Sequence, residues 1–330
     1  MLHAIPPLAL VCIALIIGFT GLVWSADRFV AGAASIAKSF GVAPLIIGLT
    51  IVSFGTSAPE IMVSISASLK GAGDLAVGNA IGSNIANIGL VLGATTLVAA
   101  IPVQSHILRH EMPILLIITL VSGFFLLDAT LTLIEGIILL VMLVPAILYL
   151  VKIKQSELSA HEVAEEESLE DLSTGAAFAW FGVGLLALML SSEVLVWGAK
   201  SAAEMAGVSP LIIGLTVIAL GTSLPELAAS MMSAIKGHHD IALGNIVGSN
   251  MFNLMAVMSI PGIVTPTIMD DSVFNRDYLV MLGLTLLLAV LAAKTLWLNR
   301  KSGKAKLGRL AGSLMLGGYL GYYVLLFYTQ

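Results

Sequence analysis

The sequence predicts an all-α membrane protein in which ten membrane-spanning helices form two inverted-topology five-helix repeats. Three observations predict this fold class: the composition, the length of the apolar runs, and a long segment that occurs twice. Of the 330 residues, 58% are hydrophobic and 11% are charged, and the mean hydropathy is +1.03. Soluble domains carry about 25% charged residues. The net charge of −5, without a basic patch interleaved with aromatic residues, excludes a nucleic-acid-binding protein.

Ten apolar runs are each long enough to cross a bilayer as a helix, which takes about 20 residues. The first run lacks the basic region and the small-residue cleavage site of a signal peptide, so we interpret it as a membrane span. The ten spans cover approximately residues 6–36, 42–69, 74–101, 107–127, 131–151, 175–203, 208–235, 240–264, 278–298 and 308–328.

One polar segment divides the chain into two halves. Residues 152–174 read KIKQSELSAHEVAEEESLEDLST and predict an acidic, soluble linker. This segment lacks the Gly and the terminal Glu of an EF-hand loop, so we interpret it as a solvated connector. The expected domains are residues 1–151, the first five-helix half, and residues 175–330, the second five-helix half.

Positive charge predicts the orientation in the membrane. The loops and helix ends on the side of the linker hold twelve of the 15 Lys and Arg residues. The opposite side holds only Lys70, Lys200 and Arg276. Because positively charged loops stay in the cytoplasm, we expect a cytoplasmic linker and two extracytoplasmic termini.

A long segment occurs twice in the chain. Residues 41–60, GVAPLIIGLTIVSFGTSAPE, match residues 207–226, GVSPLIIGLTVIALGTSLPE, and the match continues without a gap from 74–87 to 240–253. The offset between matched residues is constant, 226 − 60 = 166. Because each half holds five spans, an odd number, the second half enters the membrane the other way up. Such inverted repeats are typical of secondary transporters.

Glu60 and Glu226 occupy equivalent positions near the middle of apolar runs. Ionisable residues at that depth are costly and are normally functional. A neutral Glu that hydrogen-bonds between helices would explain one such residue. Two of them at equivalent positions of an inverted repeat favour a shared ion site.

A Pro stands directly before each Glu. Pro59 and Pro225 lack an N–H group and clash with the carbonyl one turn earlier, so backbone oxygens are freed nearby. Irregular backbone at membrane depth is tolerated only where it is buried or lines a cavity. A packing kink would explain each Pro alone, but not the carboxylate that follows it. The hydroxyl groups expected beside the carboxylates are those of Thr56, Ser57, Thr222 and Ser223.

A second motif, Gly-Asn-x-x-Gly-Ser-Asn-x-x-Asn, also occurs in both repeats. Three of its polar residues are spaced i, i+4 and i+8, so they share one face of a helix. They are Asn79, Ser83 and Asn87 in the first repeat and Asn245, Ser249 and Asn253 in the second. A polar seam between helices is the alternative interpretation. Together with the Glu motifs, the pattern favours an ion site.

The repeat motifs carry oxygen-bearing side chains and no Cys or His. Hard oxygen ligands suit calcium and sodium, whereas soft metals prefer sulfur or imidazole. Two carboxylates neutralise one calcium ion. The mixture of carbonyl, hydroxyl and carboxylate oxygens suits calcium better than magnesium, which demands near-octahedral geometry. No resident cofactor is expected, because these ions would be the transported cargo.

GTSAPE with GNAIGSNIAN, and GTSLPE with GNIVGSNMFN, resemble the two α-repeats of the sodium/calcium exchanger family, within the cation/calcium antiporter superfamily. The resemblance covers spans one to three and six to eight, and ten spans fit the prokaryotic members. It implies an antiporter that exchanges calcium for sodium by alternating access in the inner (cytoplasmic) membrane, and no enzyme. The expected partners are calcium ions, sodium ions and the lipid bilayer, with the oligomeric state left open.

The resemblance also implies a role for each site residue. Glu60 and Glu226 would be the central carboxylates shared by calcium and sodium. Ser53 and Ala219 would offer backbone carbonyls at the outer sodium positions. The other expected ligands are Thr56 and Thr222 with backbone and side-chain oxygens, Ser57, Ser83, Ser223 and Ser249 with side-chain oxygens, and Asn87 and Asn253 beside the central site.

The charge of the site bears on potassium and on voltage. In potassium-coupled relatives an Asp occupies the position that matches Asn253, which is a neutral amide in this chain. We therefore expect exchange without potassium. The resemblance implies three sodium ions for one calcium ion, a load that moves one net charge per cycle, so exchange would be electrogenic.

Two other functions stay open at this point. A calcium/proton antiporter of the same superfamily typically carries a Glu soon after the Gly-Asn of the second motif. This chain has Ala80-Ile81 and Ile246-Val247 there. A passive cation channel usually builds its selectivity from oligomeric rings. One chain with two pseudo-symmetric half-sites favours alternating access instead.

Overall fold

A computed structural model describes residues 8–156, 172–207, 219–300 and 305–329. Within these residues, eight helices are long and apolar enough to cross a membrane, and a bent pair of helices makes a ninth crossing. Of the span predicted at 208–235, residues 208–218 lie outside the described residues, and the remainder is helical. The structure therefore agrees with the predicted all-α fold and is consistent with ten spans.

The first half contains these helices and strands in order. They are α1 (Leu8–Phe40), α2 (Pro44–Ile47), the π-helical segment η1 (Gly48–Val52), α3 (Ser53–Thr56), α4 (Ala58–Leu69), α5 (Gly73–Ala86), η2 (Asn87–Leu92), α6 (Gly93–Val98), β1 (Ile101–Pro102), η3 (Ile107–Glu111), α7 (Met112–Phe125), β2 (Thr130–Leu131) and α8 (Leu133–Ser156).

The second half repeats this order. Its described elements are α10 (Thr174–Met205), α12 (Ala219–Thr222), α13 (Leu224–Ile235), α14 (His239–Phe252), η5 (Asn253–Val257), α15 (Ser259–Val264), β3 (Thr267–Ile268), η6 (Val273–Tyr278), α16 (Leu279–Leu298), β4 (Lys306–Leu307) and α17 (Arg309–Thr329). The starts of α4 and α13, of α5 and α14, and of η2 and η5 are all separated by the offset of the sequence repeat.

The predicted linker is shorter at its start than the sequence indicated. Helix α8 continues to Ser156, five residues into the segment predicted at 152–174, and α10 begins at Thr174. Residues 157–171 lie outside the described residues. The helix extends because the residues after 151 include Lys and Ile but no Pro or Gly.

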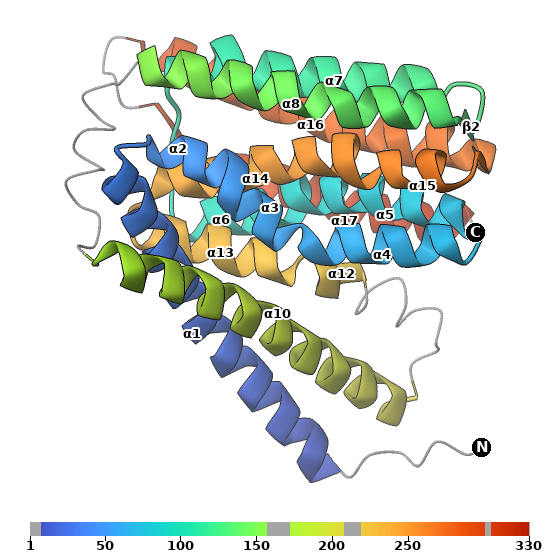
Figure 1. Cartoon of the computed structure of the whole chain (residues 1–330). Helices are drawn as coiled ribbons and strands as arrows, with labels where there is room; N and C mark the ends of the chain where they lie inside the picture. Colours follow the sequence, from blue (N-terminus) through green and yellow to red (C-terminus); the bar gives the residue numbers. More distant parts are fainter. Residues whose placement is uncertain (1–7, 157–171, 208–218, 301–304, 330) are drawn as a thin grey trace.

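The spanning helices lie roughly side by side, and their ends define two faces of the molecule (Figure 1). We call the face where α8 ends and α10 begins the linker face, and the face where α17 ends the termini face. A two-stranded antiparallel sheet joins the two halves at each face. At the linker face Ile101 of β1 is paired with Leu307 of β4, and at the termini face Thr130 of β2 is paired with Ile268 of β3.

Helices α1 and α10 form a closely packed pair that runs obliquely along one side of the other helices (Figure 1). Small residues allow this close approach. A Cβ atom at Gly18 would lie 2.7 Å from the backbone nitrogen of Leu195, and one at Gly184 would lie 2.5 Å from the backbone nitrogen of Phe29. Because the backbones touch at two levels, α1 and α10 pack as one unit.

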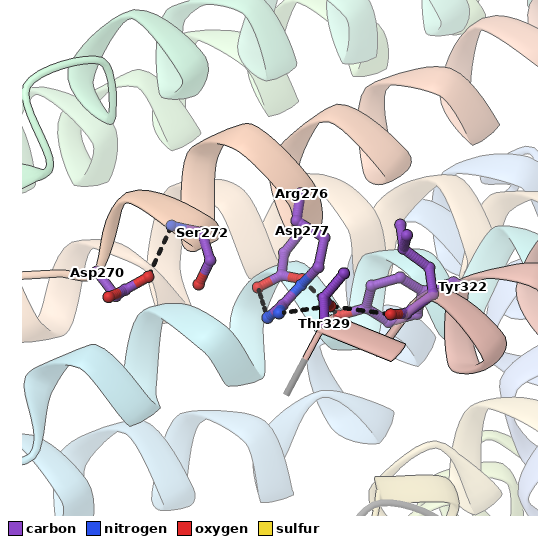
Figure 2. A network of polar contacts seen from close by, with 7 residues as sticks. Asp270, Ser272, Arg276, Asp277, Tyr322 and Thr329 are labelled. Atoms are coloured by element: carbon purple, nitrogen blue, oxygen red, sulfur yellow. Dashed lines mark hydrogen bonds and ion pairs between the residues drawn. The ribbon is translucent and has the colours of Figure 1, made fainter. Parts of the chain in front are cut away.

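A polar network at the termini face joins η6 to α17 (Figure 2). The Arg276 guanidinium donates to both carboxylate oxygens of Asp277, at 2.7 and 3.1 Å, and to Thr329 Oγ1 at 3.1 Å. The Tyr322 hydroxyl donates to Asp277 Oδ1 at 3.0 Å. In the exposed loop before η6, hydrogen bonds from Ser272 lower the pKa of the Asp270 carboxyl. These contacts anchor the scaffold away from the predicted site.

Candidate ion-binding site

Two helix breaks place the predicted site between the halves. The chain leaves helical geometry at Ser57 (ψ 4°) and at Ser223 (ψ 2°), and each helix resumes with a Pro in its first turn. In the first half the segments before and after the break are bent by 44°. Because Pro59 and Pro225 have no N–H group to continue the ladder, each break exposes polar backbone and starts a new helix with Glu in its first turn.

The two carboxyl groups meet at this level. Glu60 and Glu226 are each 1% exposed, and they lie close enough for their charges to repel each other. The Ser57 hydroxyl donates to Glu226 Oε1 at 3.4 Å, so a hydroxyl of the first half contacts the carboxylate of the second. The Ser83 hydroxyl lies near the Glu60 carboxyl. The breaks therefore bring together two carboxylates that are far apart in the sequence.

Hydroxyl and amide groups of α14 complete one side of this cluster. The Thr56 hydroxyl donates to Asn245 Oδ1 at 3.1 Å and lies 3.5 Å from the Ser249 hydroxyl. Asn245 in turn donates from Nδ2 to Ser230 Oγ at 2.8 Å. A continuous polar path thus runs from the break in the first half through α14 to α13.

Asn87 and Asn253 begin the π-helical segments η2 and η5. Both side chains are buried, at 1% and 0% exposure. Within the described residues, neither amide has a hydrogen-bond partner for its nitrogen or its oxygen. Single π-helical turns are common at functional sites, and a turn with one extra residue rotates the amide relative to the helix before it.

The remaining predicted ligands are placed unevenly. Ser223 is buried and its hydroxyl has no partner among the described residues, whereas Thr222 is half-buried. The Ser53 carbonyl already accepts from the Ser57 N–H at 2.9 Å and lies 3.4 Å from the Thr56 hydroxyl, so the helix itself uses this oxygen. Ala219 is the first residue of α12, one turn before the break.

Several buried oxygens of the cluster lack partners in the described part of the chain. A buried polar group without a hydrogen bond costs about 1–3 kcal/mol, and folded proteins seldom keep many of them. The occurrence of such atoms on residues of both repeat motifs fits a site that coordinates cations with oxygen. The unpartnered atoms are Glu60 Oε2, Glu226 Oε2, Ser223 Oγ and both amide atoms of Asn87 and Asn253.

Ser64 and Ser230 were not among the predicted site residues, and Asn245 was predicted only as part of the polar helix face of the second motif. Ser64 and Ser230 each follow a Glu by four residues, which places them on the same helix face as the carboxylate. Ser230 accepts from Asn245, and Ser64 donates to the Val257 carbonyl at 2.8 Å. The sequence repeat could have indicated both Ser residues, because Ser64 and Ser230 match each other at the repeat offset.

A cavity of about 370 Å³ reaches this cluster from one side. Its lining includes Pro59 and Met62 of the first half and Glu193, Thr222 and Pro225 of the second. Because α4 runs from Ala58 beside the cluster to Leu69 at the termini face, the cavity lies on the termini side of the carboxylates. On the linker side α13 is packed against α1, and Ala229 is fully buried there.

Inverted repeats with broken helices that meet at paired carboxylates define a secondary transporter for cations. The comparisons with known proteins then identify the family. A sequence model described as "Sodium/calcium exchanger protein" matches residues 10–152 and 176–328. The chain belongs to this sodium/calcium exchanger family of antiporters, as the motifs predicted, and it is a transporter and not an enzyme.

Relatives cover nearly the whole chain. CaxA of Alkalimonas amylolytica is 44% identical over 315 residues, covering 94% of this chain and 97% of CaxA. The inner membrane protein YrbG of Escherichia coli (strain K12) is 40% identical over 321 residues, covering 96% of each chain. A solved structure of the sodium-calcium exchanger NCX_Mj superimposes with a TM-score of 0.81 at 29% identity, covering 96% of this chain and 99% of that one.

Proposed function

We propose that this chain exchanges calcium for sodium by alternating access, with Glu60 and Glu226 as the shared carboxylates. One observation carries the proposal: two buried carboxyl groups from opposite repeats lie together among hydroxyl and amide groups. Two negative charges offset one divalent ion in a medium where an unpaired charge is very costly. Both carboxylates are fixed inside the membrane. Calcium and sodium, which move in opposite directions, would therefore compete for the same oxygens.

The donor set favours calcium and sodium over softer metals. Hydroxyl, amide and carboxylate oxygens surround the two Glu residues, and oxygen ligands are those that these cations prefer. The described residues contain no group of three or more His, Cys, Asp and Glu side chains that could hold a metal ion. The proposed ligands are Glu60, Glu226, Thr56, Thr222, Ser57, Ser223, Ser83 and Ser249, with Asn87 and Asn253 beside them and the Ser53 and Ala219 carbonyls further out.

A calcium/proton antiporter is the second candidate, because two facing carboxyl groups also exchange protons. The residues that follow Asn79 and Asn245 bear on this choice. Ala80, Ile81, Ile246 and Val247 are buried and apolar, so they add no third carboxylate to the cluster. This arrangement favours sodium as the counter-ion.

We further propose that exchange is electrogenic and independent of potassium. The site then holds two carboxylates and two neutral amides, Asn87 and Asn253, and one bound calcium leaves it neutral. Three sodium ions for each calcium ion move one net charge per cycle. The proposed location is the inner (cytoplasmic) membrane, with the 152–174 linker in the cytoplasm and both termini outside.

Calcium flux into proteoliposomes tests this function. Purified protein is reconstituted, and uptake of radioactive calcium is followed under an imposed gradient of sodium, protons or potassium. We expect uptake driven by a sodium gradient alone. Uptake driven by a proton gradient alone would establish the second candidate, and uptake without any counter-ion would indicate a channel.

A further inference from the structure

Helix α13 is tied to α1 by an ion pair on the linker side of the site. Lys236, directly after α13, lies with its Nζ 2.8 Å from Asp27 Oδ1, and the same nitrogen donates to the Asp27 carbonyl at 3.4 Å. Arg28 Nε lies 3.7 Å from the other Asp27 oxygen, and the Arg28 guanidinium lies 5.0 Å from the centre of the Trp180 ring of α10. The Asp27 carboxylate therefore connects the α1–α10 unit to the bundle.

The inverted repeat contains this acid and this base twice. Asp27 aligns with Glu193, and Lys236 aligns with Lys70, both at the offset of 166. Of the ten positions 61–70, only Ser64 and Lys70 are identical to their partners in the second half. Lys70 is therefore kept within a stretch whose other residues have changed, and Ser64 belongs to the ion cluster described above.

The second acid and base are apart in this structure. Glu193 is exposed and lines the cavity on the termini side, and Lys70 is exposed at the end of α4. Within the described residues neither of them forms an ion pair. The helix faces differ in the same way, because Val63 of α4 is 36% exposed whereas its partner Ala229 of α13 is fully buried.

We propose that Asp27 and Lys236 form a latch that holds the linker side closed, and that Glu193 and Lys70 form the matching latch when the termini side closes. The proposal rests on the alternating access proposed above. The α1–α10 unit would move as one body along the bundle, so that α10 covers α4 as α1 leaves α13. Each half-cycle then breaks one ion pair and makes its counterpart.

The strength of such a pair suits a latch that opens in every cycle. Asp27 and Lys236 keep 33% and 19% of their side-chain surface exposed. Ion pairs that are partly exposed to solvent add little stability, enough to shift an equilibrium by about two- to fivefold. The pair therefore biases the carrier toward one face without locking it there.

Paired cysteine reporters test this proposal in the full-length protein. Cys12, the only cysteine, is first replaced by Ser. Ala229→Cys then reports on the linker side and Val63→Cys on the termini side, each through its rate of reaction with a soluble thiol reagent. No calcium or sodium gradient is imposed, so the readout is independent of which ions the protein exchanges.

Removing the charge at each lysine gives opposite predictions. Lys236→Met keeps an unbranched apolar side chain and should raise the labelling of Ala229→Cys about two- to fivefold while lowering that of Val63→Cys. Lys70→Met should shift both rates in the opposite direction, because it weakens the other latch. Lys236→Arg keeps the charge and should leave both rates near those of the parent protein.

Two further results decide the matter. Exchanging the charges, with Asp27→Lys and Lys236→Asp together, should restore the parent labelling, which a merely structural loss of packing would not do. Equal shifts from Lys236→Met and Lys70→Met in the same direction would overturn the proposal, as would unchanged labelling in both. Calcium flux measured on the same variants reports separately on the proposed function, because that assay depends on the ions and the labelling does not.

Discussion

The helices that carry the two Glu residues, α4 and α13, have the same length and nearly the same break, yet their surroundings differ. Helix α13 is packed beneath α1, and its Ala229 is fully buried. Helix α4 leaves Met62 and Val63 exposed at 62% and 36%, beside the cavity that reaches the cluster. The two repeat-related helices therefore occupy different environments in this structure, and the proposed alternating access would exchange those environments.

The helices that carry the second motif, α5 and α14, also differ in how tightly they are packed. Helix α14 is buried along almost its whole length, and a Cβ atom at Gly248 would lie 2.5 Å from the Leu49 carbonyl oxygen. A Cβ atom at Gly82, its partner in α5, would meet no atom within 4 Å among the described residues. The seam between α14 and the first half is therefore tight in this state.

The largest expected effect is the loss of calcium exchange when either carboxylate is neutralised. It tests whether both halves are equally needed for the site. Glu60→Gln and Glu226→Gln should each abolish calcium exchange, because each leaves one negative charge to offset a divalent ion. Flux of radioactive calcium into proteoliposomes measures this. Glu204→Gln, on the exposed part of α10, is the matched control and should retain exchange. Near-normal flux in either site variant would contradict the shared-site account.

The second prediction sharpens the comparison of α14 with α5. Gly248→Ala should lower the free energy of unfolding by about 1–3 kcal/mol, because the added methyl group overpacks the seam with η1. Gly82→Ala should change it by about 1 kcal/mol or less and can be stabilising, since Ala favours helix. Thermal unfolding in detergent compares the two. An equal loss in both variants would show that α5 is packed as tightly as α14.

A smaller effect concerns the two amides. The wild type should exchange calcium equally well with and without potassium, and its rate should follow the membrane potential, worth about 2.3 kcal/mol per charge per 100 mV. Asn253→Asp adds a carboxylate and should make exchange respond to potassium by about fivefold or more. Asn87→Asp is the matched variant in the other half. A potassium requirement in the wild type would contradict the proposed coupling.

Orientation decides which compartment the open side faces, without any change in activity. A cysteine introduced at Ser159, in the linker, should stay protected from an impermeant thiol reagent added to intact cells, in a Cys12→Ser background. It should react once the cells are opened. Ready labelling from outside would reverse the topology and place the cavity of this structure on the cytoplasmic side.

Much of the fold was predictable because the spans and the repeat can be recognised from residues that are neighbours in the sequence. The spans, the offset of 166, and the breaks at Pro59 and Pro225 follow from apolar runs and from the chemistry of Pro. The two Glu residues stood out because a carboxylate at membrane depth needs a reason. These features depend on neighbours in the chain, and the structure agrees with the fold that they predicted.

Other features depend on contacts between distant segments and were out of reach. The link from Thr56 through Asn245 to Ser230 joins three helices. The sequence does not indicate how these helices are aligned with one another. The two small sheets and the π-helical turns at Asn87 and Asn253 likewise arise from packing. The unequal burial of α4 and α13 depends on how α1 and α10 are packed against them, which the local sequence does not indicate.

Spin-label distances on two matched pairs test the alternation most directly. Met62 and Met189 line the cavity on the termini side, and the repeat offset relates them to Ala228 and Val23 on the linker side. Labels at Met62–Met189 and at Ala228–Val23, in separate samples, are compared in sodium and in calcium. Alternating access predicts two distances for each pair, and the short distance should gain population in one pair as it loses population in the other. Distances that lengthen together, or a single fixed distance in both pairs, would contradict it.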